Sequence, residues 1–227
     1  MKVLAVVPAF NEEECLANTI SELKRTCPDV DYLVVNDGSS DDTAKVIRAQ
    51  NLNGVNLPVN TGLASAFRTG AKYAARNGYD ALIQFDADGQ HVPSYIPDML
   101  LALTQNDADI VIASRYLDGS IKPAGARGAG SKLITALIKL TTNKTITDPT
   151  SGMRMYSKRM IQMIATGYDI APEPDFIALV ARKYGQVVEI QAQMRERQGG
   201  ESYLKLGNVI RYMSRTCLAI IMSRFLR

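Results

Sequence analysis

The sequence Ala-Leu-Ile-Gln-Phe-Asp-Ala-Asp-Gly-Gln-His fills residues 81–91 and begins as an apolar strand that ends on two acids. Asp86 and Asp88 are two residues apart, so in an extended segment their carboxylates point to the same side. Carboxylate oxygens, with Gln90 as a neutral oxygen donor, suit Mg²⁺ or Mn²⁺ and leave coordination positions for phosphate oxygens. Asp-x-Asp is also common in solvated turns, so this interpretation depends on the rest of the chain.

Short β-rich runs alternate with helical patterns around this segment, as in proteins built from βαβ units. The alternation predicts an α/β fold with a mostly parallel sheet and flanking helices. We expect strands at residues 3–7, 31–36, 81–85, 109–113, 153–156 and 187–190. We expect helices at residues 16–23, 63–74, 132–140 and 175–184, with two more starting at residue 42 and after residue 93.

Three local features refine this outline. Asn11 and Glu14 have the spacing of a capping box for the first helix, and Asp41 is a cap for the second. Residues 117–131 hold four glycines and one proline, which predicts a mobile loop over a ligand site. Arg154 lies in a short apolar strand, where a buried arginine needs a partner, and we expect Asp148 to supply it.

Polar clusters follow four of the expected strands, and ligands of open α/β sheets bind at the carboxyl ends of the strands. The clusters lie at residues 8–14, 36–43, 86–90 and 114–116. Each cluster alone is compatible with a turn or a helix cap; Asp37 and Gly38, for example, form a common turn pair. Their convergence on one edge favours a single ligand site there.

The composition limits the classes of protein to which the chain can belong. Its 227 residues are 46% hydrophobic and 22% charged, which fits a globular α/β domain with an appendage. A single histidine excludes multi-histidine metal sites, and we expect His91 to be a hydrogen-bonded wall of the site. Three cysteines lack disulfide or zinc spacing and no secretory leader precedes the first strand, so we expect a cytoplasmic protein. No Gly-x-Gly-x-x-Gly follows the first strand, which disfavours a dinucleotide-dependent dehydrogenase.

Positive charge is concentrated at the C-terminal end. Residues 195–227 carry seven lysines and arginines against two glutamates, a net +5 that leaves −2 for the remainder of a chain totalling +3. We divide the chain into a catalytic domain at residues 1–203 and a basic amphipathic helix at residues 204–227. The apolar face of that helix comprises Leu206, Val209, Ile210, Met213 and Cys217. The helix either lies on an anionic membrane surface or packs on its own domain or in a homo-oligomer.

Three motifs together resemble the inverting glycosyltransferases of family 2. They are Val-Pro-Ala-Phe-Asn-Glu-Glu at residues 7–13, Val-Asn-Asp-Gly-Ser-Ser-Asp-Asp-Thr at residues 35–43 and Asp-Ala-Asp-Gly-Gln-His at residues 86–91. The segments at residues 114–116, 148–154 and 197–202 extend the resemblance over nearly the whole chain, toward the polyprenyl-phosphate (dolichyl-phosphate) hexose synthase branch. The resemblance implies the GT-A fold, the Rossmann-like fold of nucleotide-diphospho-sugar transferases.

The resemblance also implies an activity. A hexose would pass from a nucleotide sugar to polyprenyl phosphate, with inversion at the anomeric carbon and with Mg²⁺ or Mn²⁺ as cofactor. UDP-glucose and UDP-N-acetylglucosamine are the donors that we favour. The enzyme would be peripheral on the cytoplasmic face of the cell membrane, alone or with a separate membrane protein, and would supply cell-envelope polysaccharide or protein glycosylation. Nucleic acid is not an expected partner.

Roles for individual residues come with the resemblance. The nucleotide-binding set is Pro8, Asn11, Glu12, Asp37, Gly62 and Asp86. The metal ligands are Asp86, Asp88 and Gln90. The phosphate- and acceptor-binding set is Arg115, Arg197 and Ser202, and the catalytic set is Asp88, Arg115, Arg197 and Asp175.

The acceptor decides the role of Asp175. A lipid phosphate is already an anion at neutral pH and attacks the sugar carbon without a base. A sugar hydroxyl on a lipid-linked glycan needs a base, and Asp175 is then the candidate. We favour the phosphate, because the Arg-x-x-Gly-x-Ser element at residues 197–202 belongs to that branch. A nucleotide-sugar-binding module without catalysis is disfavoured, because the acidic and arginine residues of the site are all present.

Overall fold

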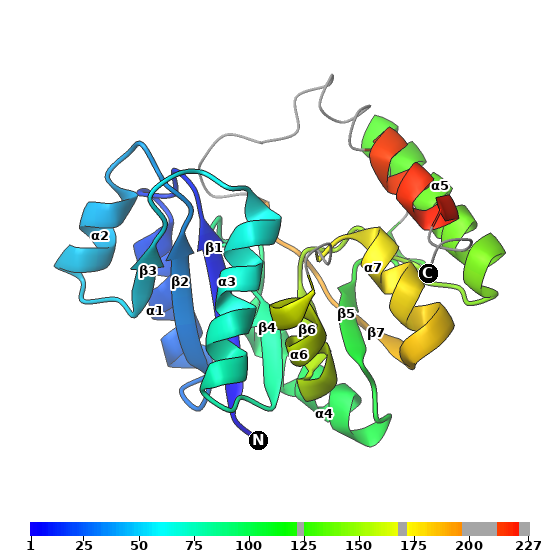
Figure 1. Ribbon diagram of the computed structural model, residues 1–227, viewed down its shortest axis with the longest axis horizontal. Helices are drawn as coiled ribbons and strands as arrows, with labels where there is room; N and C mark the ends of the chain where they lie inside the picture. Colours follow the sequence, from blue (N-terminus) through cyan, green and yellow to red (C-terminus); the bar gives the residue numbers. More distant parts are fainter. Residues whose placement is uncertain (122–124, 168–171, 197–212, 223–227) are drawn as a thin grey trace.

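The computed structural model describes residues 1–121, 125–167, 172–196 and 213–222, and a seven-stranded sheet runs through its centre (Figure 1). The strand order is β3-β2-β1-β4-β6-β5-β7. β6 is antiparallel to β4 and β5, whereas all other neighbours are parallel. The strands are β1 (Val3–Ala9), β2 (Asp31–Asn36), β3 (Gly54–Asn56), β4 (Ala81–Gln84), β5 (Ile110–Ser114), β6 (Arg154–Ser157) and β7 (Val187–Gln191). The prediction of a mostly parallel α/β sheet is confirmed.

Helices cover both faces of this sheet. They are α1 (Leu16–Thr26), α2 (Thr43–Ala49), α3 (Leu63–Arg76), α4 (Ile96–Gln105), α5 (Gly125–Thr142), α6 (Lys158–Thr166) and α7 (Pro174–Leu179), which continues as a π-helical turn at Val180–Tyr184. A short 3₁₀ turn at Pro93–Tyr95 precedes α4, and a further helix spans residues 213–222.

Strand β1 shows why helices pack on both faces of the sheet. Leu4 and Val6 belong to one hydrophobic cluster and Val3, Ala5 and Val7 to the other, so successive side chains enter opposite layers. Helices α3, α5, α6, α7 and 213–222 contribute to the first cluster, and α1, α2 and α4 to the second. Burial on both faces accounts for the uninterrupted apolar runs of the central parallel strands.

Gly70 allows α3 to lie directly on β1. A Cβ at this position would lie 2.4 Å from both γ-methyl carbons of Val6, far inside van der Waals contact. A larger residue would therefore move the helix away from the sheet. Because α3 begins immediately after Gly62, this contact also fixes where that glycine stands at the sheet edge.

Two local predictions are wrong. Asn11 does not cap α1: Cys15 precedes the helix without a side-chain cap, and the Asn11 side chain instead accepts the Ser40 N–H at 2.9 Å. The predicted loop at residues 117–131 is helical from Gly125 onward. A Cβ on Gly130 would meet Met213 at 3.0 Å, so this glycine serves helix–helix packing and does not mark a loop. The Asp41 cap is closer to the prediction, because its carboxylate accepts the N–H of Thr43, the first residue of α2, at 3.0 Å.

Helix 213–222 lies beside α5 (Figure 1). Thr216 and Ile220 are buried, and Met213 packs on the cluster that Ile220 joins. This part of the predicted amphipathic helix thus packs on its own domain, and whether it also faces a membrane or a partner stays a prediction; residues 204–212 lie outside the described residues. Within the described residues, no helix combines the length and the hydropathy needed to cross a bilayer.

Candidate active site

The carboxyl ends of β1, β2, β4 and β5 meet at one edge of the sheet, as the positions of the polar clusters predict. β1 ends beside β2 with Ala9 opposite Asn36, and β4 lies on the other side of β1. β5 runs in the same direction beyond the antiparallel β6. Residues that follow four separate strands are thereby brought to one side of the molecule.

The loops after β1 and β2 are tied together by hydrogen bonds. The N–H of Asn11 donates to Ser39 Oγ at 3.0 Å, and the N–H of Glu12 donates to Thr43 Oγ1 at 2.9 Å. Asn11 has a positive φ of 57°, which an asparagine adopts more readily than most residues. Pro8, Asn11 and Glu12 are all partly exposed at this edge, so the structure groups the first three predicted nucleotide-binding residues; their contact with a nucleotide stays a prediction.

Asp37 holds the segment that leads into α3. Its Oδ1 accepts the N–H and the hydroxyl of Thr61, both at 2.8 Å, and its Oδ2 accepts the N–H of Gly62 at 2.7 Å. The carboxylate is 3% exposed and already has three donors, so it acts on the shape of the pocket wall. The contact with a base that the sequence suggests stays a prediction.

Gly62 stands at the N-terminus of α3 with a positive φ of 87°. No heavy atom of the described residues lies within 4 Å of the position that a Cβ would take. The left-handed backbone requires glycine here, and the open space beside it is available to a ligand that approaches the main chain.

Asp86 is placed by His91 and Gly152. His91 Nδ1 accepts the N–H of Asp86 at 2.9 Å, so the ring proton is on Nε2, which lies 3.5 Å from Asp86 Oδ2. His91 is 3% exposed and edge-on to Phe85, with the ring centroids 5.5 Å apart. The hydrogen bonding predicted for His91 is confirmed, and its place in the wall of a ligand site stays a prediction. A Cβ on Gly152 would lie 2.8 Å from Asp86 Oδ2, so a larger residue would have to displace this carboxylate.

Asp88 and Gln90 form the next part of the same turn. The N–H of Gln90 donates to Asp88 Oδ1 at 3.1 Å, and Asp88 is 3% exposed. The amide nitrogen of Gln90 donates to the carbonyl of Arg195 at 3.3 Å, so its oxygen is the atom that can ligate a metal. Arg195 in turn forms a two-point pair with Glu22 at 2.8 Å for each bond, which holds the pKa of Glu22 below its ordinary value.

These residues fit a divalent cation that prefers oxygen. Asp86 and Asp88 offer carboxylates and Gln90 an amide oxygen, which are hard ligands suited to Mg²⁺ or Mn²⁺. His91 is not among them, because both of its ring nitrogens face Asp86. The described part of the chain has no group of three or more His, Cys, Asp and Glu side chains that could hold a metal. A cation here would therefore depend on Asp86, Asp88, Gln90 and the phosphate oxygens of a bound nucleotide.

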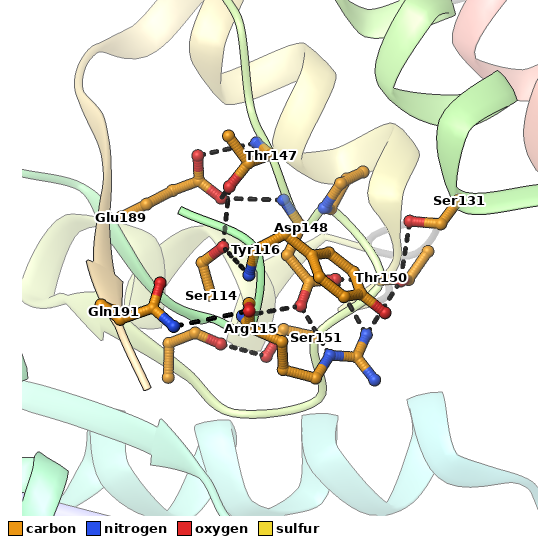
Figure 2. A network of polar contacts seen from close by, with 12 residues as sticks. Ser114, Arg115, Tyr116, Ser131, Thr147, Asp148, Thr150, Ser151, Glu189 and Gln191 are labelled. Carbon is orange, nitrogen blue, oxygen red and sulfur yellow. Dashed lines mark hydrogen bonds and ion pairs between the residues drawn. The ribbon is translucent and has the colours of Figure 1, made fainter. Parts of the chain in front are cut away.

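Arg115 is held by Asp148 (Figure 2). Its Nε donates to Asp148 Oδ2 at 2.7 Å and its Nη2 to Oδ1 at 2.9 Å, a two-point pair with a fully buried carboxylate. These bonds hold the pKa of Arg115 above its ordinary value. The Arg115 side chain stays 32% exposed. Thr150 and Ser131 place their hydroxyls beside it, Thr150 at 3.3 Å from Nη2 and Ser131 at 3.4 Å from Thr150.

The predicted pair of Arg154 with Asp148 is wrong, because Asp148 faces Arg115. Arg154 is buried and donates from Nη1 to the carbonyl of Pro172 at 2.6 Å and from Nη2 to that of Pro149 at 2.9 Å. A guanidinium has five N–H donors and can satisfy backbone carbonyls as well as a carboxylate. Arg154 thus ties the segment after residue 148 to the one before α7.

An acidic pair at the start of α7 follows Pro172, whose carbonyl Arg154 binds. Glu173 precedes the helix and Asp175 lies in its first turn. Burial, and then the charge of Asp175, raise the pKa of Glu173, while Arg215 and Arg154 act in the opposite direction. The predicted catalytic Asp175 is therefore a partly exposed residue at a helix N-terminus next to a second, partly buried acid. Arg197 and Ser202 lie outside the described residues.

Four residues that the sequence did not single out take part in this arrangement: Thr61, Ser131, Thr147 and Glu189. Glu189 accepts hydrogen bonds from the 147–148 segment, and Thr61 completes the contacts of Asp37. Their sequence surroundings carry no motif of their own. Their roles depend on contacts between distant parts of the chain, which local patterns do not report.

Comparisons with known proteins agree with the pattern of these residues. The family model described as Glycosyl transferase family 2 matches residues 4–164. An undecaprenyl-phosphate mannosyltransferase of Micrococcus luteus is 30% identical over 222 residues, which cover 92% of this chain and 90% of that protein. An undecaprenyl-phosphate 4-deoxy-4-formamido-L-arabinose transferase of Sodalis glossinidius is 29% identical over 238 residues, covering 99% of this chain and 70% of that protein.

The fold is also shared with a solved structure. Glucosyl-3-phosphoglycerate synthase from Mycobacterium tuberculosis, in complex with Mn²⁺, UDP-glucose and phosphoglyceric acid, superposes with a TM-score of 0.70 at 20% identity. The match covers 98% of this chain and 79% of that one. At this identity the likeness concerns the fold, and it confirms the prediction of the GT-A architecture.

Proposed function

Since the chain belongs to glycosyl transferase family 2, we propose that this glycosyltransferase moves a hexose from a nucleotide sugar to polyprenyl phosphate, inverting the anomeric carbon. The observation that carries the proposal is the placement of Asp86, Asp88 and Arg115 at one sheet edge. Two relatives that align with more than nine-tenths of the chain are named for sugar transfer to undecaprenyl phosphate.

The donor would lie across the ends of β1, β2 and β4. The interlocked loops of Asn11 and Glu12, with the open main chain at Gly62, would receive the base and ribose. Asp86, Asp88 and Gln90 would hold the Mg²⁺ or Mn²⁺, which, when bound, neutralises charge on the diphosphate. Charge builds on the departing nucleoside diphosphate during the reaction. Because the carboxylates and Arg115 are already held in place, they need little rearrangement to stabilise that charge in the transition state.

The acceptor phosphate would meet Arg115 from its exposed side. One phosphate oxygen forms a bond to the anomeric carbon while the bond from that carbon to the nucleoside diphosphate breaks, which inverts the centre in one displacement. A phosphate is an anion at neutral pH, so the step needs no proton acceptor. Beside Arg115, the Thr150 hydroxyl donates to Asp148 Oδ1 at 3.1 Å and so helps to hold the acid that orients the guanidinium.

The alternative acceptor, a sugar hydroxyl on a lipid-linked glycan, gives Asp175 the role of base. Asp175 adjoins Glu173, whose pKa is raised by burial and by Asp175, and such pairs are common where a carboxyl group handles a proton. The substitution Asp175→Asn separates the two. Loss of turnover in a folded variant would favour the hydroxyl acceptor, and retained turnover would favour the phosphate.

We also propose that α5 and helix 213–222 form the surface that rests on the membrane. Leu133 and Leu140 on α5 are 51% and 74% exposed, and Lys132 and Lys139 on the same helix are exposed beside them. The neighbouring helix leaves Leu218, Ile221 and Met222 between 42% and 57% exposed, with Arg215 also exposed. Apolar side chains flanked by basic ones suit the boundary of an anionic bilayer. We further propose, as the sequence suggests, that this peripheral position is on the cytoplasmic face of the membrane.

The sequence and the relatives point to different donor sugars. UDP-glucose and UDP-N-acetylglucosamine are the donors that we favour from the sequence, whereas the relatives above are named for mannose and for 4-deoxy-4-formamido-L-arabinose. GDP-mannose is therefore a necessary member of any donor panel.

The proposal is tested by measuring nucleoside diphosphate release from UDP- and GDP-sugars, with Mg²⁺ or Mn²⁺, in the presence and absence of polyprenyl phosphate. We expect release from one donor that requires both the lipid and the metal. Asp88→Asn should abolish it, and Asp80→Asn, an exposed acid at the opposite end of β4, should not. If nucleoside diphosphate release does not depend on the lipid phosphate with any donor, the proposal is contradicted.

A further inference from the structure

Glu189 lies on β7, the edge strand beside β5, and its carboxylate faces the segment before β6 (Figure 2). It accepts three hydrogen bonds: from the N–H of Thr147 at 2.7 Å, from the hydroxyl of Thr147 at 3.0 Å and from the N–H of Asp148 at 2.9 Å. A charged acceptor with three neutral donors on two successive residues fixes the direction of that main chain.

The second link runs from that main chain to Arg115. Asp148, whose N–H is bound by Glu189, directs its carboxylate to three donors of Arg115: Nε at 2.7 Å, Nη2 at 2.9 Å and the main-chain N–H at 3.1 Å. Asp148 is fully buried, so water does not compete for these bonds. Glu189 therefore positions Asp148, and Asp148 in turn positions the guanidinium of Arg115.

The same strand also holds the main chain of Arg115. Gln191, two residues after Glu189 and on the same side of β7, donates from Nε2 to the carbonyl of Arg115 at 3.4 Å. Among the described residues, no hydrogen bond uses Nη1 of Arg115, and the side chain is 32% exposed. Arg115 is thus fixed by Nε, Nη2 and its backbone, and its Nη1 end is left for an anion.

We propose that Glu189 is a positioning residue for Arg115, acting through Thr147 and Asp148 so that Nη1 is presented to a phosphate of the substrates. This inference rests on the proposed function in one respect, the identity of that phosphate. Glu189 itself touches no reacting atom. Glu189 affects catalysis only by fixing the position of the Arg115 guanidinium. An experiment that removes Arg115 can therefore distinguish this effect from a general effect on folding.

A double-mutant cycle tests the proposal. Glu189→Gln removes one acceptor oxygen and turns an amide N–H₂ toward the donors of Thr147, so we expect kcat/KM to fall about tenfold, the lower end for a residue that supports a catalytic group. In an Arg115→Met background the same substitution should lower kcat/KM by less than about twofold. Equal losses in both backgrounds would overturn the proposal, because Glu189 would then act independently of Arg115. Glu189→Asp, which keeps the charge, should recover part of the loss.

A second measurement does not depend on turnover. In ¹⁵N-labelled protein, the Nε–H of Arg115, identified by its absence in Arg115→Met, should exchange slowly with solvent because Asp148 holds it. Glu189→Gln should accelerate that exchange, whereas Asp109→Asn should not. Asp109 is a matched control: it is a buried acid paired with Arg159 at the opposite end of β5. Unchanged exchange in Glu189→Gln would overturn the positioning role. Absence of turnover in the wild type would count against the proposed function and leave this result intact.

Discussion

Gly152 lies so close to Asp86 that a Cβ at position 152 would stand 2.8 Å from the Oδ2 of that carboxylate and 3.2 Å from Nε2 of His91. The φ of Gly152 is not positive, so space and not backbone torsion requires glycine here. The segment before β6 thus forms one wall around an acid that follows β4. This contact links the segment that leads into the antiparallel strand β6 to the turn after β4.

Gly152→Ala should therefore displace Asp86 and His91 and lower activity at least tenfold, since misplacement of a binding group by a fraction of an ångström is costly. Steady-state nucleoside diphosphate release and the urea midpoint would be measured together. Gly78→Ala is the control: its φ is +69° and open space surrounds it, so it should cost about 1 kcal/mol of stability from backbone strain and leave kcat unchanged. Full activity of Gly152→Ala would show that the position of Asp86 is unimportant.

Asp37→Asn should weaken the connection between the loop after β2 and the start of α3. The carboxylate accepts three hydrogen bonds from Thr61 and Gly62, and an amide can accept these on one side alone. We expect a loss of about 2 kcal/mol in the free energy of unfolding. The KM for the donor should rise more than kcat falls, because the open position at Gly62 moves. Urea titration and donor-dependent kinetics test this, and an unchanged KM would separate Asp37 from donor binding.

Glu173→Gln should stabilise the protein at neutral pH. The pKa of Glu173 is raised in the folded state, chiefly by burial and next by Asp175, so its protonated form is favoured by folding and its ionised form is disfavoured. Protonated Glu173 therefore adds to the free energy of unfolding. This stabilisation is complete below the pKa of the unfolded state and is lost as pH rises through the pKa of the folded state. Glutamine imitates the protonated form, so the variant should be the more stable protein at neutral pH and should match the wild type well below pH 4.5, the ordinary pKa of this carboxyl group. Equal urea midpoints at all pH values would contradict this.

Leu133→Glu and Leu218→Glu should reduce binding to vesicles that contain anionic lipid. Both side chains are more than half exposed, so the substitutions should change the free energy of unfolding by less than about 0.5 kcal/mol. Cosedimentation with vesicles would be compared with Leu101→Glu, a similarly exposed leucine on α4, on the opposite face of the sheet. If all three variants bind as the wild type does, α5 and helix 213–222 are not the membrane surface.

Apolar runs ending on polar clusters were sufficient to predict the sheet, because each central strand is buried on both faces and the alternation with helices leaves few arrangements. β3 was missed: it has three residues, and it forms through pairing with β2. α6 was missed although Ser157 accepts the N–H of Met160 and residues 160, 161 and 164 are buried, a cap and a spacing that the sequence does contain. Gly125, Gly128 and Gly130 misled in the opposite direction: all three lie within α5, where Gly130 packs against Met213.

The site was predictable at the level of which strand ends carry it. The partners of its side chains were not, because they come from distant parts of the chain. Asp148 pairs with Arg115, 33 residues before it, and not with the nearby Arg154, which instead binds two carbonyls. Asp37 binds Thr61, 24 residues later. Choosing between two available arginines requires the direction of β6 and the register of β5, which no local pattern contains.

³¹P NMR of the lipid product shows whether a lipid phosphate is the nucleophile. Wild-type protein would be incubated with the preferred nucleotide sugar, divalent metal and short-chain polyprenyl phosphate, and the lipid then extracted. We predict that the phosphate monoester signal is replaced by that of a sugar phosphodiester. We also predict that Asp175→Asn makes the same product. If nucleoside diphosphate is released while the monoester signal persists, the lipid phosphate is not the nucleophile.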